Sequence, residues 1–164
     1  SPGPLRLPRS LRSLAMTIIL NDIVTFKIGG SAGQGIKSMG LIFAKIATRS
    51  GYHVYNYSEY PSLIRGGHNV VAVNFSLREV TAPKKSTDFL VALNQETINR
   101  HSLELAPGGA VLFESETTME LSALDKSVNL FPIPLSKLGR YPNRNFEASL
   151  RVRWISVLLR NQIR

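Results

Sequence analysis

The sequence predicts an α/β fold, a layered sandwich with a mainly parallel sheet. Short apolar runs typical of strands alternate along the chain with amphipathic stretches typical of helices. A glycine-rich turn separates the first such strand from the first helix, as in units that wind a chain back onto a parallel sheet. With 164 residues, 43% of them hydrophobic, the chain can bury one core and contains no apolar run long enough to span a membrane.

The first unit is predicted most clearly. Residues 23–28 form a strand, residues 28–35 a glycine-rich loop, and a helix follows until Gly51, before a second strand at residues 53–57. This order predicts a Rossmann-like βαβ start with a parallel pair and a right-handed crossover. The buried face of the helix is expected to be Ile36, Met39, Gly40, Phe43, Ala44, Ala47 and Thr48.

The later elements follow at short intervals. Residues 69–76 predict a strand that is antiparallel at an edge or paired locally, and residues 88–93 predict a buried strand. Asn94 is a good N-cap for a helix that ends at Pro107-Gly108-Gly109. The apolar side of this helix is expected to include Ile98, Leu103 and Leu105. Two short parallel strands complete the sheet, at residues 110–113 and 128–131, the second ending at Pro132 and Pro134.

Basic residues gather at the two ends of the chain. The net charge is +9, of which residues 1–16 carry +3 and residues 140–164 carry +5, so residues 17–139 are almost neutral. A nucleic-acid binder is expected to carry a basic stripe on its folded domain. We therefore expect no nucleic-acid partner. Separately, we expect no membrane partner and a cytoplasmic location.

This charge distribution suggests three regions. Residues 1–16 are expected to be a leader outside the fold, disordered or not native to the protein, with an organellar presequence as the other interpretation. Residues 17–139 form the α/β domain. Residues 140–164 form a basic tail that is either an amphipathic helix or a truncated continuation. The apolar face of such a helix consists of Phe146, Leu150, Trp154, Val157 and Leu158.

The chain contains no cysteine. This excludes disulfides, cysteine-ligated iron–sulfur clusters and thiol catalysis within the chain. Its three histidines, His53, His68 and His101, give little support to a protein-built transition-metal site. No metal ligand and no catalytic residue is therefore assigned.

The first glycine cluster is a candidate cofactor-binding loop. A helix N-terminus with free backbone N–H groups can hold a phosphate of coenzyme A or of another nucleotide. The alternative is a tight turn used only for packing. The loop lacks the Lys-Ser/Thr ending of an ATP loop, and no acidic residue other than Glu59 stands near the end of the second strand, which leaves nicotinamide binding as a weaker alternative. The candidate residues are Gly29, Gly30, Gly33, Gln34 and Gly35.

The second glycine cluster, residues 61–69, is a candidate interface. Arg65 can bind a carboxylate or phosphate through two parallel hydrogen bonds, and the adjacent glycines let another backbone approach. An internal salt bridge and a bulge or turn are the alternative. A single histidine at a strand start is more often a hydrogen-bonded structural residue than a base or ligand. The candidate residues are Tyr60, Pro61, Ser62, Arg65, Gly66, Gly67 and His68.

Acid–base and nucleophile candidates are weaker. Ser31, Ser38 and Ser62 lie near the glycine clusters, but the sequence has no Gly-x-Ser-x-Gly elbow to expose one of them. Glu114 and Glu116 follow a predicted strand and can face one way, but a solvated loop is the favoured explanation of this pair.

Together, these motifs carry a resemblance to a known family. The run from Gly29 to Gly35, then Gly51-Tyr52-His53-Val54, then residues 57–69 resemble the gamma subunit or domain of 2-oxoacid:ferredoxin oxidoreductases. The form Tyr60-Pro61-Ser62, followed by Ile64-Arg65-Gly66-Gly67-His68, is most similar to the gamma domain fused to the alpha subunit in 2-oxoglutarate-type enzymes.

The resemblance implies a component of an enzyme complex. Such complexes oxidatively decarboxylate a 2-oxoacid, transfer the acyl group to coenzyme A and pass electrons to ferredoxin. It implies alpha and beta partners that carry thiamine diphosphate and iron–sulfur clusters, with ferredoxin an indirect partner, and no activity of this chain alone. A non-enzymatic nucleotide- or coenzyme-A-binding assembly module and an NAD-dependent enzyme remain alternatives.

Overall fold

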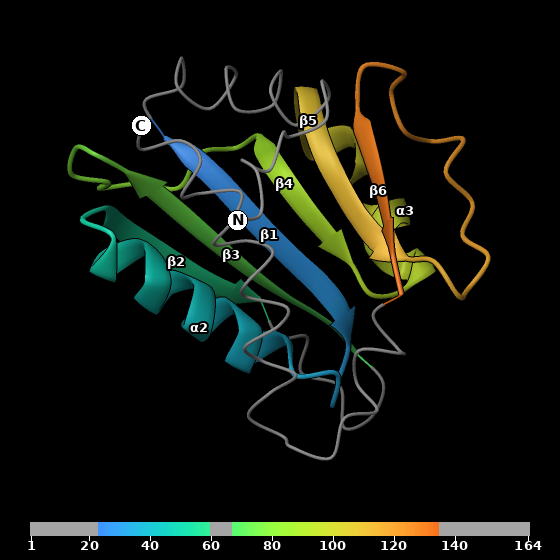
Figure 1. Cartoon of the computed structure of the whole chain (residues 1–164), viewed down its shortest axis with the longest axis horizontal. Helices are drawn as coiled ribbons and strands as arrows, with labels where there is room; N and C mark the ends of the chain where they lie inside the picture. The colour runs from blue at the N-terminus through green and yellow to red at the C-terminus, as the bar shows by residue number, and fades with distance from the viewer. Residues whose placement is uncertain (1–22, 60–66, 135–164) are drawn as a thin grey trace, which may run out of the picture.

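The computed structural model describes residues 23–59 and 67–134, which form a six-stranded sheet in the order β2-β3-β1-β4-β5-β6 (Figure 1). In chain order its strands are β1 (Val24–Ser31), β2 (His53–Glu59), β3 (His68–Ser76), β4 (Thr87–Ala92), β5 (Leu105–Glu114) and β6 (Asn129–Ile133). The helices of the described part are α2 (Ile36–Arg49), α3 (Gln95–His101) and the short 3-10 helix η1 (Ser102–Glu104).

The sheet is mixed and mostly parallel, as predicted. β4 is parallel to both β1 and β5, and β6 is parallel to β5. β3 is antiparallel to both of its neighbours, β1 and β2. The predicted α/β fold class is therefore confirmed.

The predicted parallel pair at the start of the chain is wrong in one respect. β1 and β2 run in the same direction but are not neighbours, because β3 lies between them and pairs with both. The strand expected at an edge or paired locally is thus internal, although it does pair with the strand that precedes it. Burial explains the order: eight of the nine residues of β3 are buried, whereas β2 has none, so β2 is the strand that tolerates the edge.

Helix α2 packs against β1, β2 and β3 (Figure 1). The predicted face holds for Ile36, Gly40, Phe43, Ala44 and Ala47, which are buried. Thr48 is exposed instead, and its hydroxyl donates to the Ala44 carbonyl (2.9 Å), which satisfies the hydroxyl within the helix. The chain leaves the helix through Gly51, whose φ of +88° favours glycine, as predicted.

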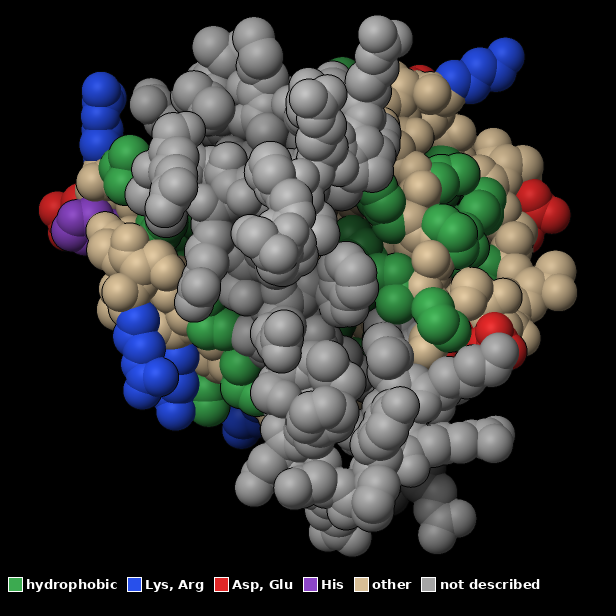
Figure 2. Space-filling model, in the orientation of Figure 1, with side chains coloured by type: hydrophobic (Ala, Val, Ile, Leu, Met, Phe, Trp, Pro, Cys, Tyr) green, Lys and Arg blue, Asp and Glu red, His purple; other side chains and the backbone are tan. Residues whose placement is uncertain are grey.

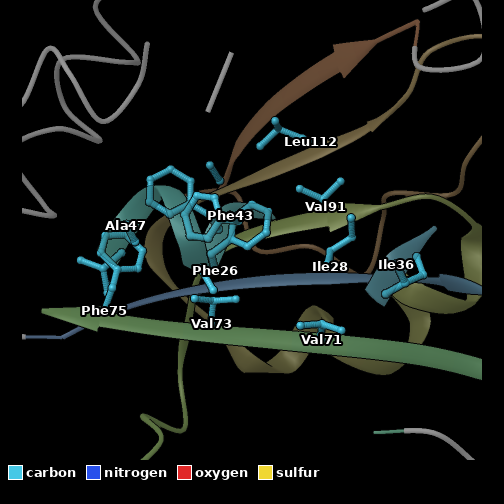
Figure 3. Close-up of a cluster of buried hydrophobic side chains, with 14 residues drawn as sticks. Phe26, Ile28, Ile36, Phe43, Ala47, Val71, Val73, Phe75, Val91 and Leu112 are labelled. Carbon is cyan, nitrogen blue, oxygen red and sulfur yellow. The ribbon is translucent and has the colours of Figure 1, made fainter. Parts of the chain in front are cut away.

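The main core lies between α2 and the sheet (Figure 3). The Phe43 ring of α2 stacks on Phe26 of β1 at 4.1 Å and meets Phe75 of β3 edge-on at 5.5 Å. A second cluster packs α3 against the opposite face of the sheet, around Leu90 and Ile98. The sheet is therefore buried on both faces, as parallel pairing requires.

The helix after Asn94 is shorter than predicted. It ends at His101, and Leu103 of η1 is 95% exposed instead of lying on an apolar face. Pro107-Gly108-Gly109 does not end a helix but lies within β5, which begins at Leu105. The register between β4 and β5 shifts there, because two steps along β4, from Thr87 to Phe89, correspond to five steps along β5, from Leu105 to Ala110. A local irregularity of this kind admits proline and glycine into a strand.

The last described strand extends beyond its predicted end. β6 continues through Pro132 to Ile133. β6 is at the opposite edge of the sheet from β2, so Pro132, which lacks an N–H, can face away from the hydrogen-bonding ladder. The expected leader (1–16), the basic tail (140–164) and its amphipathic helix lie outside the described residues. Among the described helices, none is long and apolar enough to cross a membrane.

Candidate functional site

The two glycine clusters meet at one end of the sheet. In the antiparallel pairing of β1 with β3, Ser31 lies opposite His68, and Gly30 lies opposite Asn69. The end of the first cluster therefore neighbours the end of the second, although a helix and a strand separate them in the chain. Of the predicted interface residues, Gly67 and His68 are described and both are buried. The others, Tyr60, Pro61, Ser62, Arg65 and Gly66, lie outside the described residues.

The loop between β1 and α2 is a tight turn that its own residues close. The Gln34 N–H donates to the Ser31 carbonyl (3.2 Å), and the Ser31 N–H donates to the Gln34 side-chain oxygen (2.6 Å). Gly33 and Gly35 have positive φ values of 88° and 75°. Residues 32–35 are exposed, so the loop projects from the sheet end with its backbone accessible.

No side chain of the described residues caps the N-terminus of α2. Its N-cap, Gly35, provides no side-chain hydrogen bond, and the first turn contains no acidic residue. The basic residues of this helix are Lys37, Lys45 and Arg49, and basic side chains gather along it in Figure 2. An uncapped helix N-terminus presents backbone N–H groups and a positive dipole, which together favour a phosphate or carboxylate.

The glycines of the first cluster have two different roles. A Cβ at Gly29 would lie 2.7 Å from Thr97 Cγ2, and one at Gly30 would lie 2.4 Å from the Gln34 side-chain oxygen. These two glycines allow close packing inside the protein. A Cβ at Gly33 or Gly35 would meet no atom of residues 23–59 and 67–134 within 4 Å. Within the predicted cofactor-binding set, Gly33 and Gly35 are therefore the glycines that border free space.

The loop is anchored to the neighbouring strand end by Asn94. The Asn94 side-chain amide donates to Ser31 Oγ (3.0 Å), and its oxygen accepts from the Thr97 N–H (3.0 Å) and hydroxyl (2.8 Å). The N-cap role of Asn94 was predicted and is confirmed. Its bond to Ser31 was not, because nothing in the local sequence relates β1 to the start of α3.

A buried polar network on the α3 side of the sheet was missed by sequence reasoning. His68 Nε2 lies 3.1 Å from His101 Nε2, and His101 Nδ1 lies 3.0 Å from Glu104 Oε1. Lys27 forms an ion pair with the other oxygen of Glu104. His68, His101 and Lys27 are only 6%, 6% and 7% exposed. The one available signal was a lysine within the otherwise apolar strand that precedes the glycines.

The surroundings shift the titration of two of these groups. Burial, and then the neighbouring His101, lowers the pKa of His68. Burial alone would raise the pKa of Glu104, but the hydrogen bonds from Lys27 and His101 outweigh it and lower the pKa. The arrangement thus favours a neutral His68 and an ionised Glu104, with His101 between them.

The acidic candidates Glu59, Glu114 and Glu116 are engaged in local hydrogen bonds and are not arranged as a catalytic pair. Glu114 is buried and accepts from the Glu116 N–H (2.9 Å), so this pair closes a turn. Glu59, the proposed ribose partner, accepts a hydrogen bond from the Tyr57 hydroxyl. Burial and this bond raise the pKa of Tyr57 to about 12. Glu59 also ends a strand that is not adjacent to β1, unlike the acidic residue of a dinucleotide site.

No group of three or more histidine, aspartate or glutamate side chains in residues 23–59 and 67–134 is arranged to hold a metal ion. The described part of the chain thus gives a loop at a helix N-terminus, an anchoring asparagine and a buried histidine pair. These features suit binding and positioning.

Comparison with known proteins identifies the family. Residues 25–151 match the model of the pyruvate ferredoxin/flavodoxin oxidoreductase family. The chain is 40% identical over 118 residues to the ketoisovalerate oxidoreductase subunit VorA of Methanothermobacter thermautotrophicus, covering 71% of this chain but 24% of that subunit. It is 27% identical to the 2-oxoglutarate synthase subunit KorC of the same organism, covering 68% of this chain and 62% of that subunit.

Solved structures of such enzymes share the fold. The 2-oxoglutarate:ferredoxin oxidoreductase of Magnetococcus marinus, with 2-oxoglutarate, coenzyme A and succinyl-CoA bound, superposes with a TM-score of 0.67 at 25% identity, over 73% of this chain and 21% of that one. The gamma subunit of a keto/oxoacid ferredoxin oxidoreductase from Geobacter sulfurreducens superposes with a TM-score of 0.63 at 24% identity, over 78% of this chain and 70% of that one. The resemblance drawn from the two glycine clusters is confirmed, and the chain belongs to the pyruvate ferredoxin/flavodoxin oxidoreductase family.

Proposed function

We propose that this chain is the gamma-type component of a 2-oxoacid:ferredoxin oxidoreductase and that its glycine loop binds a phosphate group of coenzyme A. The observation that carries the ligand proposal is the open N-terminus of α2, which Gly33 and Gly35 precede in exposed backbone of positive φ. The coenzyme A bound to the similar Magnetococcus marinus enzyme supports this choice of ligand.

In the complex, the chemistry of decarboxylation and electron transfer belongs to thiamine diphosphate and iron–sulfur clusters held by alpha and beta partners. This chain has no cysteine with which to ligate a cluster. Its own part is to bind and orient: the loop holds an anionic end of coenzyme A, while the second glycine cluster contacts the partner subunits. Ferredoxin receives the electrons from the partners and has no direct contact with this chain. We place the complex in the cytoplasm.

The ligand proposal is tested by titrating the full chain with coenzyme A, dephospho-coenzyme A and NAD in a calorimeter. We expect coenzyme A to bind and Lys37→Gln to weaken its binding by about five-fold, the effect of removing roughly 1 kcal/mol of charge interaction near a helix N-terminus. Lys45→Gln is the matched control, because Lys45 is also exposed on α2 but lies two turns from the loop. Equal effects of the two substitutions would exclude the loop as the binding site.

The assembly proposal is tested by affinity purification of the chain from its native extract. We expect partners that contain thiamine diphosphate and iron and that reduce a dye in the presence of a 2-oxoacid. Arg65→Ala should weaken this co-purification more than it lowers the thermal stability of the chain. A chain that purifies alone and retains a nucleotide would instead support a free binding module. Preferential binding of NAD, lost on substitution of Gly33, would support the dehydrogenase alternative.

A further inference from the structure

Four polar side chains form a continuous network beneath the glycine clusters. Lys27 of β1 pairs with Glu104 of η1, which contacts His101 of α3, which in turn contacts His68 of β3. Neither ligand binding nor assembly, as proposed above, requires it. Lys27, His101 and His68 are buried, whereas Glu104 is partly exposed. Buried polar groups are costly unless they are satisfied, so the presence of three of them here calls for a role beyond packing.

We propose that His68 and His101 form a proton-controlled latch, which is closed when both rings are neutral and which releases the first residue of β3 from α3 when the pair takes up a proton. The latch would regulate the position of Gly67, and its consequence for assembly rests on the proposed interface role of the second glycine cluster.

One added proton is sufficient to open the contact between the two rings, because the hydrogens of the neutral pair are fixed by its neighbours. Because the Glu104 carboxylate only accepts, His101 Nδ1 carries a hydrogen, and the 3.1 Å gap between the two Nε2 atoms requires one hydrogen as well. In the neutral pair, His68 Nε2 donates to His101 Nε2. His68 Nδ1 is then a bare nitrogen, and in the described part of the chain it is buried with no hydrogen-bond partner.

A further proton has no favourable position. If it enters at His68 Nδ1, or if His68 changes tautomer to accept from His101, a buried N–H is left without an acceptor. If it enters at His101 Nε2 instead, two N–H groups face each other across 3.1 Å. Every arrangement with one extra proton therefore either leaves a buried N–H donor without an acceptor or forces the two rings apart.

The charges around the pair leave this conclusion unchanged. His101 and Arg100 of α3 oppose a positive His68, whereas Glu96 of α3 and Glu59 of β2 favour it. The carboxylate of Glu104 contacts His101 through one oxygen and pairs with Lys27 of β1 through the other. Burial is the largest influence, and it lowers the pKa of His68. In the described part of the chain, the contact that protonation of the pair changes is the one between His68 of β3 and His101 of α3.

Because of the position of His68, opening its contact with His101 affects the region where the two glycine clusters meet. His68 is the first residue of β3, directly after Gly67, and it lies opposite Ser31. A Cβ on Gly29 would lie 3.0 Å from the His68 ring, so glycine is needed there for the ring to reach His101. Opening the pair therefore frees the chain at the point where the two glycine clusters meet.

The latch is tested by nitrogen-15 NMR of the full chain between pH 8 and pH 5. At pH 8 we expect neutral rings with the proton on Nε2 of His68 and on Nδ1 of His101. On acidification, the ring nitrogens and the backbone amides of Gly67 and Asn69 should shift in one shared transition. Ring titration without movement of these two amides, or the opposite tautomers at pH 8, would overturn the proposal.

Two variants test whether the shared transition comes from the His68–His101 pair. His101→Gln should abolish the shared transition and hold the Gly67 amide near its acidic position at every pH. The matched control is His53→Gln, because His53 is exposed on β2, and this change should leave the transition intact. The measurement uses neither coenzyme A nor a partner. Failure of the proposed function would leave it unaffected, and a static Gly67 amide in a chain that binds coenzyme A would exclude the latch alone.

Discussion

Ser31 and His68 lie opposite each other in the pairing of β1 with β3. Through this one register position, the exposed loop before α2 and the start of β3, which lies within the second glycine cluster, share an end of the sheet. The hydrogen bond from Asn94 to Ser31 links the segment after β4 to this end of the sheet. The contact between His101 and His68 links α3 to it as well. A candidate ligand loop and a candidate interface are thus joined through the pairing of β1 with β3, and each has its own polar contact with the α3 region.

Gly29→Ala should destabilise the chain by about 2 kcal/mol, because overpacking a close contact costs this much. The new Cβ would lie 2.7 Å from Thr97 Cγ2 and 3.0 Å from the His68 ring. Chemical denaturation measures the loss. Thr97→Ser removes the nearest atom, so the double variant should recover part of the stability. If the two losses simply add, the clash with Thr97 is not the cause.

Gly40→Ala tests the contact between α2 and β3. Alanine is the better helix former, but its Cβ would lie 2.3 Å from Cγ1 and 2.9 Å from Cβ of the buried Val71. We expect a net loss of about 1–2 kcal/mol, since overpacking outweighs the gain in helix propensity. Ser38→Ala, on the exposed face of the same helix, should be neutral or stabilising in the same unfolding measurement. A stabilised Gly40→Ala would contradict the packing of α2 on Val71.

Asn94→Ala should cost about 1 kcal/mol, the usual effect of losing an N-cap, and should also loosen the glycine loop. Asn94→Asp keeps the oxygen that accepts from Thr97 but removes the donor to Ser31. The aspartate variant should therefore retain most of the stability while hydrogen exchange at residues 32–35 increases. Unchanged exchange in both variants would show that Asn94 does not hold the loop.

Acid should destabilise the chain in two steps. The pKa of His68 is lowered from 6.5, so below pH 6.5 the unfolded chain binds more protons and the free energy of unfolding falls. The pKa of Glu104 is lowered from 4.5, so its contribution is complete above that pH and is lost as the pH falls through the folded value.

Thermal unfolding from pH 8 to pH 3 measures this dependence. His68→Gln should flatten the curve just below pH 6.5 and leave the step below pH 4.5 in place. His53→Gln should leave both steps unchanged. An identical pH profile for His68→Gln and the parent chain would exclude His68 as the source of the upper step.

Much of the fold could be predicted because it is local. The apolar spacing of α2, the apolar runs of β1 and β4, and the N-cap at Asn94 each depend on residues close together in the chain. The errors arose where neighbours in space decide the outcome. The end of α3 at His101 and the passage of β5 through Pro107 depend on the bulged pairing with β4.

The sequence by itself determined the class of the domain, the turn before α2 and the pair of glycine clusters that identifies the family. Only the tertiary structure decided that β3 separates β1 from β2, that Gly29 and Gly30 serve packing while Gly33 and Gly35 border open space, and that Lys27, Glu104, His101 and His68 meet. The physical reason is the separation along the chain over which each effect acts. Periodicity and turn chemistry act over a few residues, whereas strand order and buried polar contacts are selected by the burial of the whole sheet.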